Sequence, residues 1–104
     1  MADYRHARDI PDIVFLQAVA QCQDPDPHGG WHWALRDDVT RALGGLDRAA
    51  SVSSDEVPGV PWKVVIAKFR RVNQRGLAGG CDCGCRGDWY LTDKGRQLLE
   101  GDNQ

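Results

Sequence analysis

Apolar residues in the last third of the chain recur at helical spacing. In the stretch VPWKVVIAKFRRVNQRG, Val65, Phe69 and Val72 fall at positions i, i+4 and i+7, which lie on one face of a helix. Gly76 follows, and glycine is the residue that most readily adopts the left-handed conformation at a helix end. The pattern predicts a helix over residues 61–75.

The stretch after this helix changes to two short extended runs around a Gly- and Cys-rich turn, LAGGCDCGCRGDWYLT. Two such runs joined by a turn predict an antiparallel ribbon, which we call the wing, over residues 77–92 with strands at 77–81 and 88–92. Thr92 is suited to cap a short closing helix in TDKGRQLLEG, because its hydroxyl can accept a hydrogen bond from an unpaired amide there.

The first half of the chain predicts two shorter helices. A broad apolar face over residues 13–21 predicts the first, and two Asp-Pro steps with a Gly pair end it. The Trp-His-Trp triplet at 31–33 predicts a short extended piece. Residues 36–43 predict the second helix, with Val39 and Leu43 facing inward.

Length and composition fit one domain. At 104 residues the chain can bury one modest core, and we expect a single domain over residues 10–101, flanked by tails at 1–9 and 102–104. Residues 46–57 carry no decisive pattern. No apolar run approaches the ~18 residues of a membrane span, and the charged N-terminus lacks a signal peptide's apolar core. These features favour a cytoplasmic protein, mainly α with a small β-ribbon (α+β).

Charge is distributed unevenly, although the formal net charge is only −2. The helix predicted over 61–75 carries five Lys and Arg residues and no Asp or Glu. The rest of the chain carries eight basic and fifteen acidic residues, a net charge of −7. A basic helix on an acidic body is typical of a surface that attracts nucleic acid. The alternative is that these side chains form the solvated face of an amphipathic helix.

The helix exit and the return strand resemble those of the winged helix-turn-helix superfamily of bacterial and phage DNA-binding proteins. The likeness is carried by the Val65, Phe69 and Val72 stripe, the Arg-Gly-Leu exit at 75–77, and the Trp-Tyr-Leu-Thr-Asp-Lys-Gly run at 89–95. It implies three helices, a β-hairpin wing that pairs with a brief strand at 31–33, and a short C-terminal helix. One departure is the long connection before the third helix, where an ordinary helix-turn-helix has a tight turn of about three or four residues.

The resemblance implies a non-catalytic protein that binds double-stranded DNA and regulates transcription, with helix 61–75 in the major groove and the wing on the DNA backbone or in the minor groove. Lys and Arg on that helix would neutralise phosphates and give an affinity that falls with salt. We expect a homodimer formed through the first and last helices, and a monomer is the alternative because both are short. The implied DNA-contacting residues, all expected at the surface, are Trp62, Lys63, Ala67, Lys68, Arg70, Arg71, Arg75 and, at the wing tip, Arg86.

The first half of the same helix is more apolar than base reading requires. Val64, Ile66 and Ala67 stand where a base-reading helix usually carries Asn, Gln, Ser or Arg, so this stretch reads thymine methyls or packs on protein. The alternative function is therefore a winged-helix module that binds another protein through Trp62, Val64 and Ile66. Such a partner is a host protein, if the chain is phage-encoded, or a second copy of the chain.

The wing holds three alternating cysteines, Cys81, Cys83 and Cys85. In a chain without secretion features, cysteines are expected to be reduced or metal-bound. Zinc sites more commonly use C-x₂–₄-C spacing, so the pattern favours reduced thiols that shape a tight turn, and we expect no cofactor. A zinc site completed by Cys22, His28 or His32 and a strained, reducible disulfide stay open as alternatives.

The chain contains no recognisable catalytic motif. A Gly-rich phosphate loop, G-x-S-x-G and H-E-x-x-H are all absent from the sequence. No carboxylate pair or ordered nucleophile and base suggests acid–base or covalent catalysis. We expect the protein not to be an enzyme.

Overall fold

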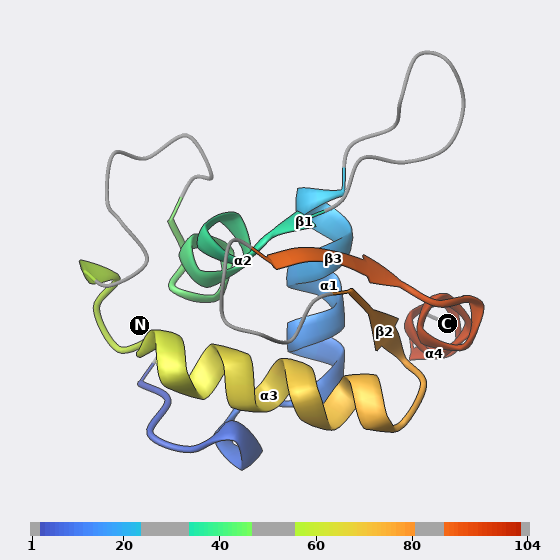
Figure 1. Cartoon of the computed structure of the whole chain (residues 1–104), viewed down its shortest axis with the longest axis horizontal. Helices are drawn as coiled ribbons and strands as arrows, with labels where there is room; N and C mark the ends of the chain where they lie inside the picture. Colours follow the sequence, from blue (N-terminus) through green and yellow to red (C-terminus); the bar gives the residue numbers. More distant parts are fainter. Residues whose placement is uncertain (1–2, 24–33, 47–55, 81–86, 103–104) are drawn as a thin grey trace.

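The fold is mainly helical with a small three-stranded antiparallel sheet, which agrees with the predicted α+β class. The structure, a computed structural model, describes residues 3–23, 34–46, 56–80 and 87–102. Figure 1 shows α1 standing across the sheet, α3 lying below it, and α2 and α4 on opposite sides. In chain order the elements are the 3-10 helix η1 (Ala7–Asp9), α1 (Asp12–Cys22), β1 (Ala34–Leu35), α2 (Arg36–Leu43), α3 (Trp62–Gln74), β2 (Ala78–Gly79), β3 (Gly87–Leu91) and α4 (Asp93–Asp102).

The helices form close to their predicted bounds. Helix α2 covers the predicted residues 36–43, and α1 and α3 each differ from the prediction by one residue at either end. Pro61 lies outside α3 as its N-cap, with an extended backbone (ψ 136°), and its carbonyl accepts the first hydrogen bonds of the helix. Val39 and Leu43 of α2 are buried, as their spacing predicted.

The end of α3 is a glycine-dependent cap. Gly76 has a φ of +76°, the left-handed conformation that the sequence predicted for it. The Leu77 amide donates to the Val72 carbonyl over 2.9 Å, and the Gly76 amide donates to the Asn73 carbonyl over 3.0 Å. This pair of hydrogen bonds is a Schellman motif, and it turns the chain directly into β2.

The sheet has the order β1-β3-β2, so β3 is its central strand. Strands β2 and β3 are the two strands of the predicted wing, with Ala78 opposite Leu91. On the other edge, β1 pairs with β3 and places Ala34 opposite Trp89. The strand predicted at 31–33 lies outside the described residues, and β1, directly after it, makes the predicted pairing with the wing.

Trp89 occupies the centre of the core. Its ring is 1% exposed and stacks on Phe69 of α3, with centroids 4.3 Å apart and planes 4° apart. Phe15 of α1 contacts the same ring at 5.9 Å with a 43° tilt. Trp89 therefore joins α1, α3 and the sheet. Val65 and Val72 are fully buried beside it, as the helical stripe predicted.

The N-terminal segment, residues 3–10, is folded against α3, whereas the sequence predicted a flexible tail at 1–9. The Tyr4 amide donates to the Gly59 carbonyl over 2.7 Å, which ties the segment to the chain just before α3. The Asp9 carboxylate accepts two backbone amide hydrogen bonds at 3.0 and 3.1 Å and closes a turn. Ala7 is buried and anchors η1. These hydrogen bonds replace those that a flexible tail would make to water, so the segment is held in place.

Helix α4 approaches the end of α3 so closely that Gly95 has no room for a side chain. A methyl group there would lie 2.1 Å from the Leu77 carbonyl oxygen, while one at Gly101 would meet nothing within 4 Å. The Thr92 hydroxyl fixes this approach, because it accepts a hydrogen bond from the Gly95 amide over 3.1 Å and donates one to the Gly76 carbonyl over 2.5 Å. Thr92 thus caps α4 as predicted.

We expect Gly95→Ala to lower the free energy of unfolding by about 1–3 kcal/mol, because either α4 or the backbone at Leu77 must move. The matched control is Gly101→Ala, in the same helix and in open space. That change should stabilise the protein by up to about 0.5–1 kcal/mol through reduced backbone entropy of the unfolded chain. Urea unfolding of both variants measures the difference; equal effects would contradict the close approach of α4.

Candidate nucleic-acid interface

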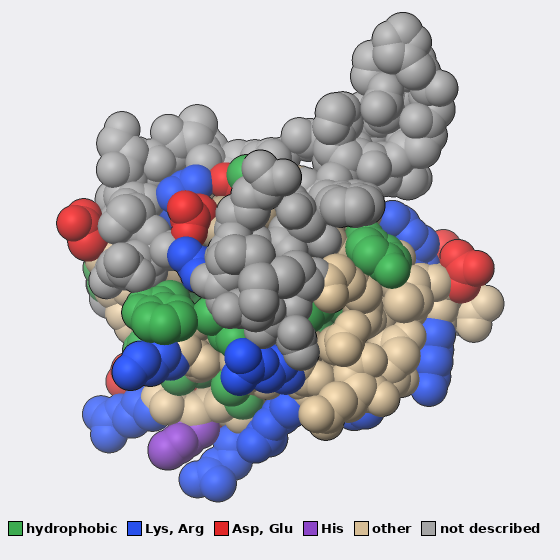
Figure 2. Space-filling model, in the orientation of Figure 1, with side chains coloured by type: hydrophobic (Ala, Val, Ile, Leu, Met, Phe, Trp, Pro, Cys, Tyr) green, Lys and Arg blue, Asp and Glu red, His purple; other side chains and the backbone are tan. Residues whose placement is uncertain are grey.

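The solvent side of α3 carries a row of positive charge. Lys63, Arg70 and Arg71 are exposed, Ala67 is half-buried among them, and α3 contains no Asp or Glu. Residues four and seven apart share a helix face, so Lys63, Ala67 and Arg70 lie in one line. Figure 2 shows Lys and Arg side chains gathered over α3 and over the N-terminal segment beneath it. We call Lys63, Ala67, Arg70 and Arg71 the basic face.

Trp62 extends the basic face at the start of α3. Its ring is 37% exposed, as the sequence predicted. The Arg36 guanidinium and the Lys63 ammonium lie 5.7 and 5.9 Å from the ring centroid. Both distances fall within the range of cation–π attraction, so the ring and the two cations form one surface.

Lys68 does not belong to this surface, which corrects the prediction that it contacts DNA. The residue is only 5% exposed, and its ammonium donates to the Asp12 carboxylate of α1 over 2.5 Å. Lys68 lies four residues after Val64 and four before Val72, both of which are buried. The inward face of α3 is therefore wider than the predicted stripe, and Lys68 lies on it.

Arg75 is also engaged by Asp12. Its guanidinium lies 2.6 Å from the second carboxylate oxygen, although the side chain is 54% exposed. Burial of Asp12 raises its pKa, but the hydrogen bonds and positive charges of Lys68 and Arg75 outweigh this effect, so the pKa of Asp12 lies below its ordinary value. One carboxylate thus engages two of the five positive side chains counted in the sequence and offsets one unit of their charge.

The apolar start of α3 packs inside its own domain, so Val64 and Ile66 present a surface neither to thymine methyls nor to a partner protein, the two roles that the sequence suggested. Val64 is 9% exposed and belongs to the hydrophobic core, and Ile66 is 5% exposed. Of the apolar strip proposed for a protein partner, only Trp62 therefore reaches solvent. The strip is not a surface in this structure, and the alternative function loses the feature on which it depended.

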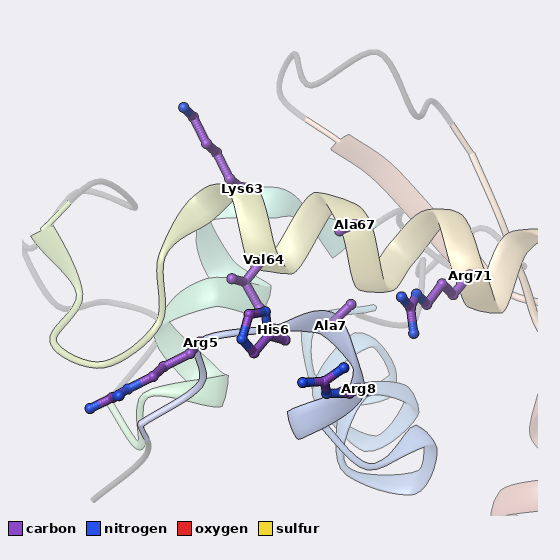
Figure 3. A pocket seen from close by; sticks show the side chains of 8 residues that line it. All are labelled: Arg5, His6, Ala7, Arg8, Lys63, Val64, Ala67 and Arg71. Carbon is purple, nitrogen blue, oxygen red and sulfur yellow. The ribbon is translucent and has the colours of Figure 1, made fainter.

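The sequence analysis did not predict a second group of basic side chains, Arg5, His6 and Arg8 of the N-terminal segment. Together with Lys63 and Arg71 they line a pocket of about 310 Å³ between this segment and α3 (Figure 3). Figure 3 shows Arg8 and Arg71 close to the pocket from opposite walls, while Lys63 and Arg5 extend away from it. The available signal was the Arg-His-Ala-Arg run at 5–8 followed by Asp9, a spacing that favours a capped turn.

Other predicted site residues lie outside the described residues. These are Arg86 at the wing tip, the three wing cysteines Cys81, Cys83 and Cys85, and the histidines His28 and His32. Cys22 is described and lies buried in the core. Within the described ranges, no cluster of three or more His, Cys, Asp or Glu side chains has an arrangement that could hold a metal ion.

No protein-family model, curated protein or solved structure matches this chain. In the part of the chain that the structure describes, no helix combines the length and the apolar character that crossing a bilayer demands. The features of the molecule that bear on its function are the basic face, the pocket beside it and the topology that presents them.

Proposed function

We propose that this protein is a winged helix-turn-helix protein that binds double-stranded DNA and regulates transcription. The order of elements supports the fold assignment: two helices flank a short strand, a longer helix follows, and a hairpin and a closing helix complete the chain. The sheet order β1-β3-β2 supports it further, because the strand between the first two helices pairs with the return strand of the wing. In this arrangement α3 is the helix that enters the major groove.

The observation that carries the DNA assignment is the basic face. Lys63, Arg70 and Arg71 are exposed along a helix that contains no acidic residue. Positive side chains in such a row neutralise successive phosphates and release the cations condensed on DNA, which is the main source of affinity for duplexes. Lys68 and Arg75 are held by Asp12, so the proposed contacts are fewer than the charge count of the sequence suggests.

The proposed homodimer is best formed through α4. Leu98 of α4 is 39% exposed, whereas Phe15, Leu16 and Val19 of α1 are fully buried inside the domain. An exposed leucine on a closing helix offers an apolar contact to a symmetry-related copy. A two-fold dimer would then present two copies of α3 to successive turns of the duplex.

The change Lys63→Gln with Arg70→Gln should reduce DNA binding without unfolding the protein, because both side chains are exposed. Wild-type protein is expected to bind random duplex DNA with an affinity that falls steeply as salt rises. The double variant should lose about 1.8 in the slope of log affinity against log salt, at roughly 0.9 per phosphate contact. Fluorescence anisotropy at several salt concentrations measures this slope.

The matched control is Lys94→Gln, which removes one positive charge from α4, where Lys94 is exposed. This variant should keep the wild-type slope. Absence of wild-type binding to duplex DNA even at low salt would refute the proposed function. An equal loss of slope per charge in Lys94→Gln and in the double variant would show that binding follows net charge and has no preferred face.

A further inference from the structure

The pocket between the N-terminal segment and α3 has an unusual electrostatic lining. Five of the side chains around it are Arg, Lys or His, and none is Asp or Glu. Ala67 lies on its α3 wall and leaves space that a larger side chain would fill. Cationic side chains that share a pocket repel one another, because the Coulomb energy of like charges rises as they approach. An anion between them removes this repulsion.

The cations are positioned by the fold. The hydrogen bond between the Tyr4 amide and the Gly59 carbonyl ties one end of the segment down, and buried Ala7 holds its middle. The Asp9 carboxylate is used inside the turn, where backbone hydrogen bonds from Arg5 and His6 lower its pKa. Arg5, His6 and Arg8 therefore belong to an ordered turn, which reduces the entropy lost when they bind a ligand.

Nearby acidic groups offset the charge of the pocket only in part: Asp3 lies 3.9 Å from Arg5, and Asp9 is next in sequence to Arg8, whose charge helps to lower the pKa of Asp9. Asp12, the first residue of α1, is occupied by Lys68 and Arg75 at 2.5 and 2.6 Å. Among the described residues, no ion pair joins a carboxylate to Arg8 or Arg71. Two guanidinium groups on opposite walls of one pocket suit a tetrahedral oxyanion, because each can donate two parallel hydrogen bonds to it.

We propose that this pocket is a phosphate-binding site and, resting on the proposed function, that the phosphate belongs to the backbone of bound duplex DNA. Ala67 lines the pocket and is also part of the basic face. A DNA strand that runs along α3 would therefore pass the opening of the pocket. The N-terminal segment would then clamp one phosphate beside the groove that α3 enters. A free phosphate compound is the other source of the same chemistry, and the experiment separates the two.

The first arm tests the pocket with inorganic phosphate. Amide signals of residues 5–8 and 63–71 should shift saturably in NMR spectra when phosphate replaces chloride at constant ionic strength. Ala67→Glu places a carboxylate into the pocket and should weaken phosphate binding at least tenfold, whereas Ala67→Gln, of equal size and without charge, should retain it. Identical spectra in phosphate and chloride would overturn the proposal.

A second readout does not depend on any ligand. If the pocket concentrates positive charge, Ala67→Glu should unfold at a higher temperature than Ala67→Gln at low salt, and the difference should shrink as salt rises. A lower unfolding temperature for Ala67→Glu would contradict the cationic character of the pocket. Both variants keep a residue that favours helix, so a loss of fold does not obscure the comparison.

The third arm decides the source of the phosphate. Arg5→Gln with Arg8→Gln should lower the salt slope of DNA binding by up to about 1.8, while Lys63 and Arg70 still support binding. An unchanged slope in this variant, with a reduced slope in Lys63→Gln/Arg70→Gln, would overturn the DNA clamp and leave the proposed function intact. Saturable phosphate shifts in a protein that binds no duplex would overturn the proposed function and assign the pocket to a free phosphate compound.

Discussion

Asp12→Asn is expected to reduce the free energy of unfolding by about 2 kcal/mol at neutral pH, because it leaves the buried ammonium of Lys68 without a counter-charge. Lys68 has a side chain only 6% exposed, and Asp12 is its partner at 2.5 Å. A fully buried pair would cost more when broken, but the Asp12 side chain is 28% exposed and water offsets part of the loss. Urea unfolding of wild type and variant measures the change.

The ion pair between Asp12 and Lys68 also makes the free energy of unfolding depend on pH. The pKa of Asp12 is lowered in the folded protein, so its contribution is complete above its ordinary value of 3.8 and is lost as pH falls through the lower folded value. The stability difference between wild type and Asp12→Asn should therefore shrink in acid. A difference that stays constant from neutral to strongly acidic pH would contradict an ionised Asp12.

Two further variants control this result. Asp3→Asn removes a carboxylate that is 71% exposed and 3.9 Å from Arg5, and it should change stability very little. Lys68→Met keeps most of the side-chain volume next to buried Val64 and Val72, and it leaves Asp12 paired with Arg75. This change should cost less than Asp12→Asn, because a buried charge without a partner is worse than an apolar replacement.

Trp89→Ala is expected to lower the free energy of unfolding more than any other single substitution proposed for this protein. The ring is buried and contacts Phe15 and Phe69, so its removal leaves a cavity between α1, α3 and the sheet. Truncation of a buried aromatic side chain costs about 3–5 kcal/mol, a large share of the roughly 5–15 kcal/mol that stabilises a small domain. Thermal and urea unfolding should show a protein that is marginally folded or unfolded.

The matched control for this cavity is Trp62→Ala, which removes the same side chain from an exposed position. It should cost about 1 kcal/mol or less, because Trp62 is 37% exposed and its ring lies next to the guanidinium of Arg36 and the ammonium of exposed Lys63. Trp89→Phe should lie between the two, since a smaller ring can still stack on Phe69. Equal losses for Trp62→Ala and Trp89→Ala would contradict the central position of Trp89.

Helix positions were predictable because they depend on short-range periodicity. A helical stripe formed by Val65, Phe69 and Val72 predicts α3. The end of this helix is also a local feature, because it needs a residue that tolerates positive φ, and Gly76 is such a residue. The bounds of α2 followed in the same way from its apolar spacing. Both wing strands were predictable from the turn residues between them, since a hairpin is also a local structure.

The functional surface was harder to predict, because charge pairing acts across the chain. The hydrogen bond from Lys68 to Asp12 joins residues 56 positions apart, and no local pattern indicates that these two side chains meet. Spacing along α3 placed Lys68 beside its exposed neighbours, whereas the tertiary structure buried it against Asp12 of α1. The packing of η1 on α3 was equally unpredictable from the charged N-terminus, because these two elements are far apart in the sequence.

The sequence by itself determined the helices, the wing and the net positive charge of the third helix, since all three depend on residues close together in the chain. Only the tertiary structure decided which of those charges face solvent. Asp12 pairs with Lys68 and Arg75, whereas Lys63, Arg70 and Arg71 are exposed on the basic face. It also decided that the N-terminal segment adds a second wall of cations, because burial and pairing are set by the neighbours that folding brings together.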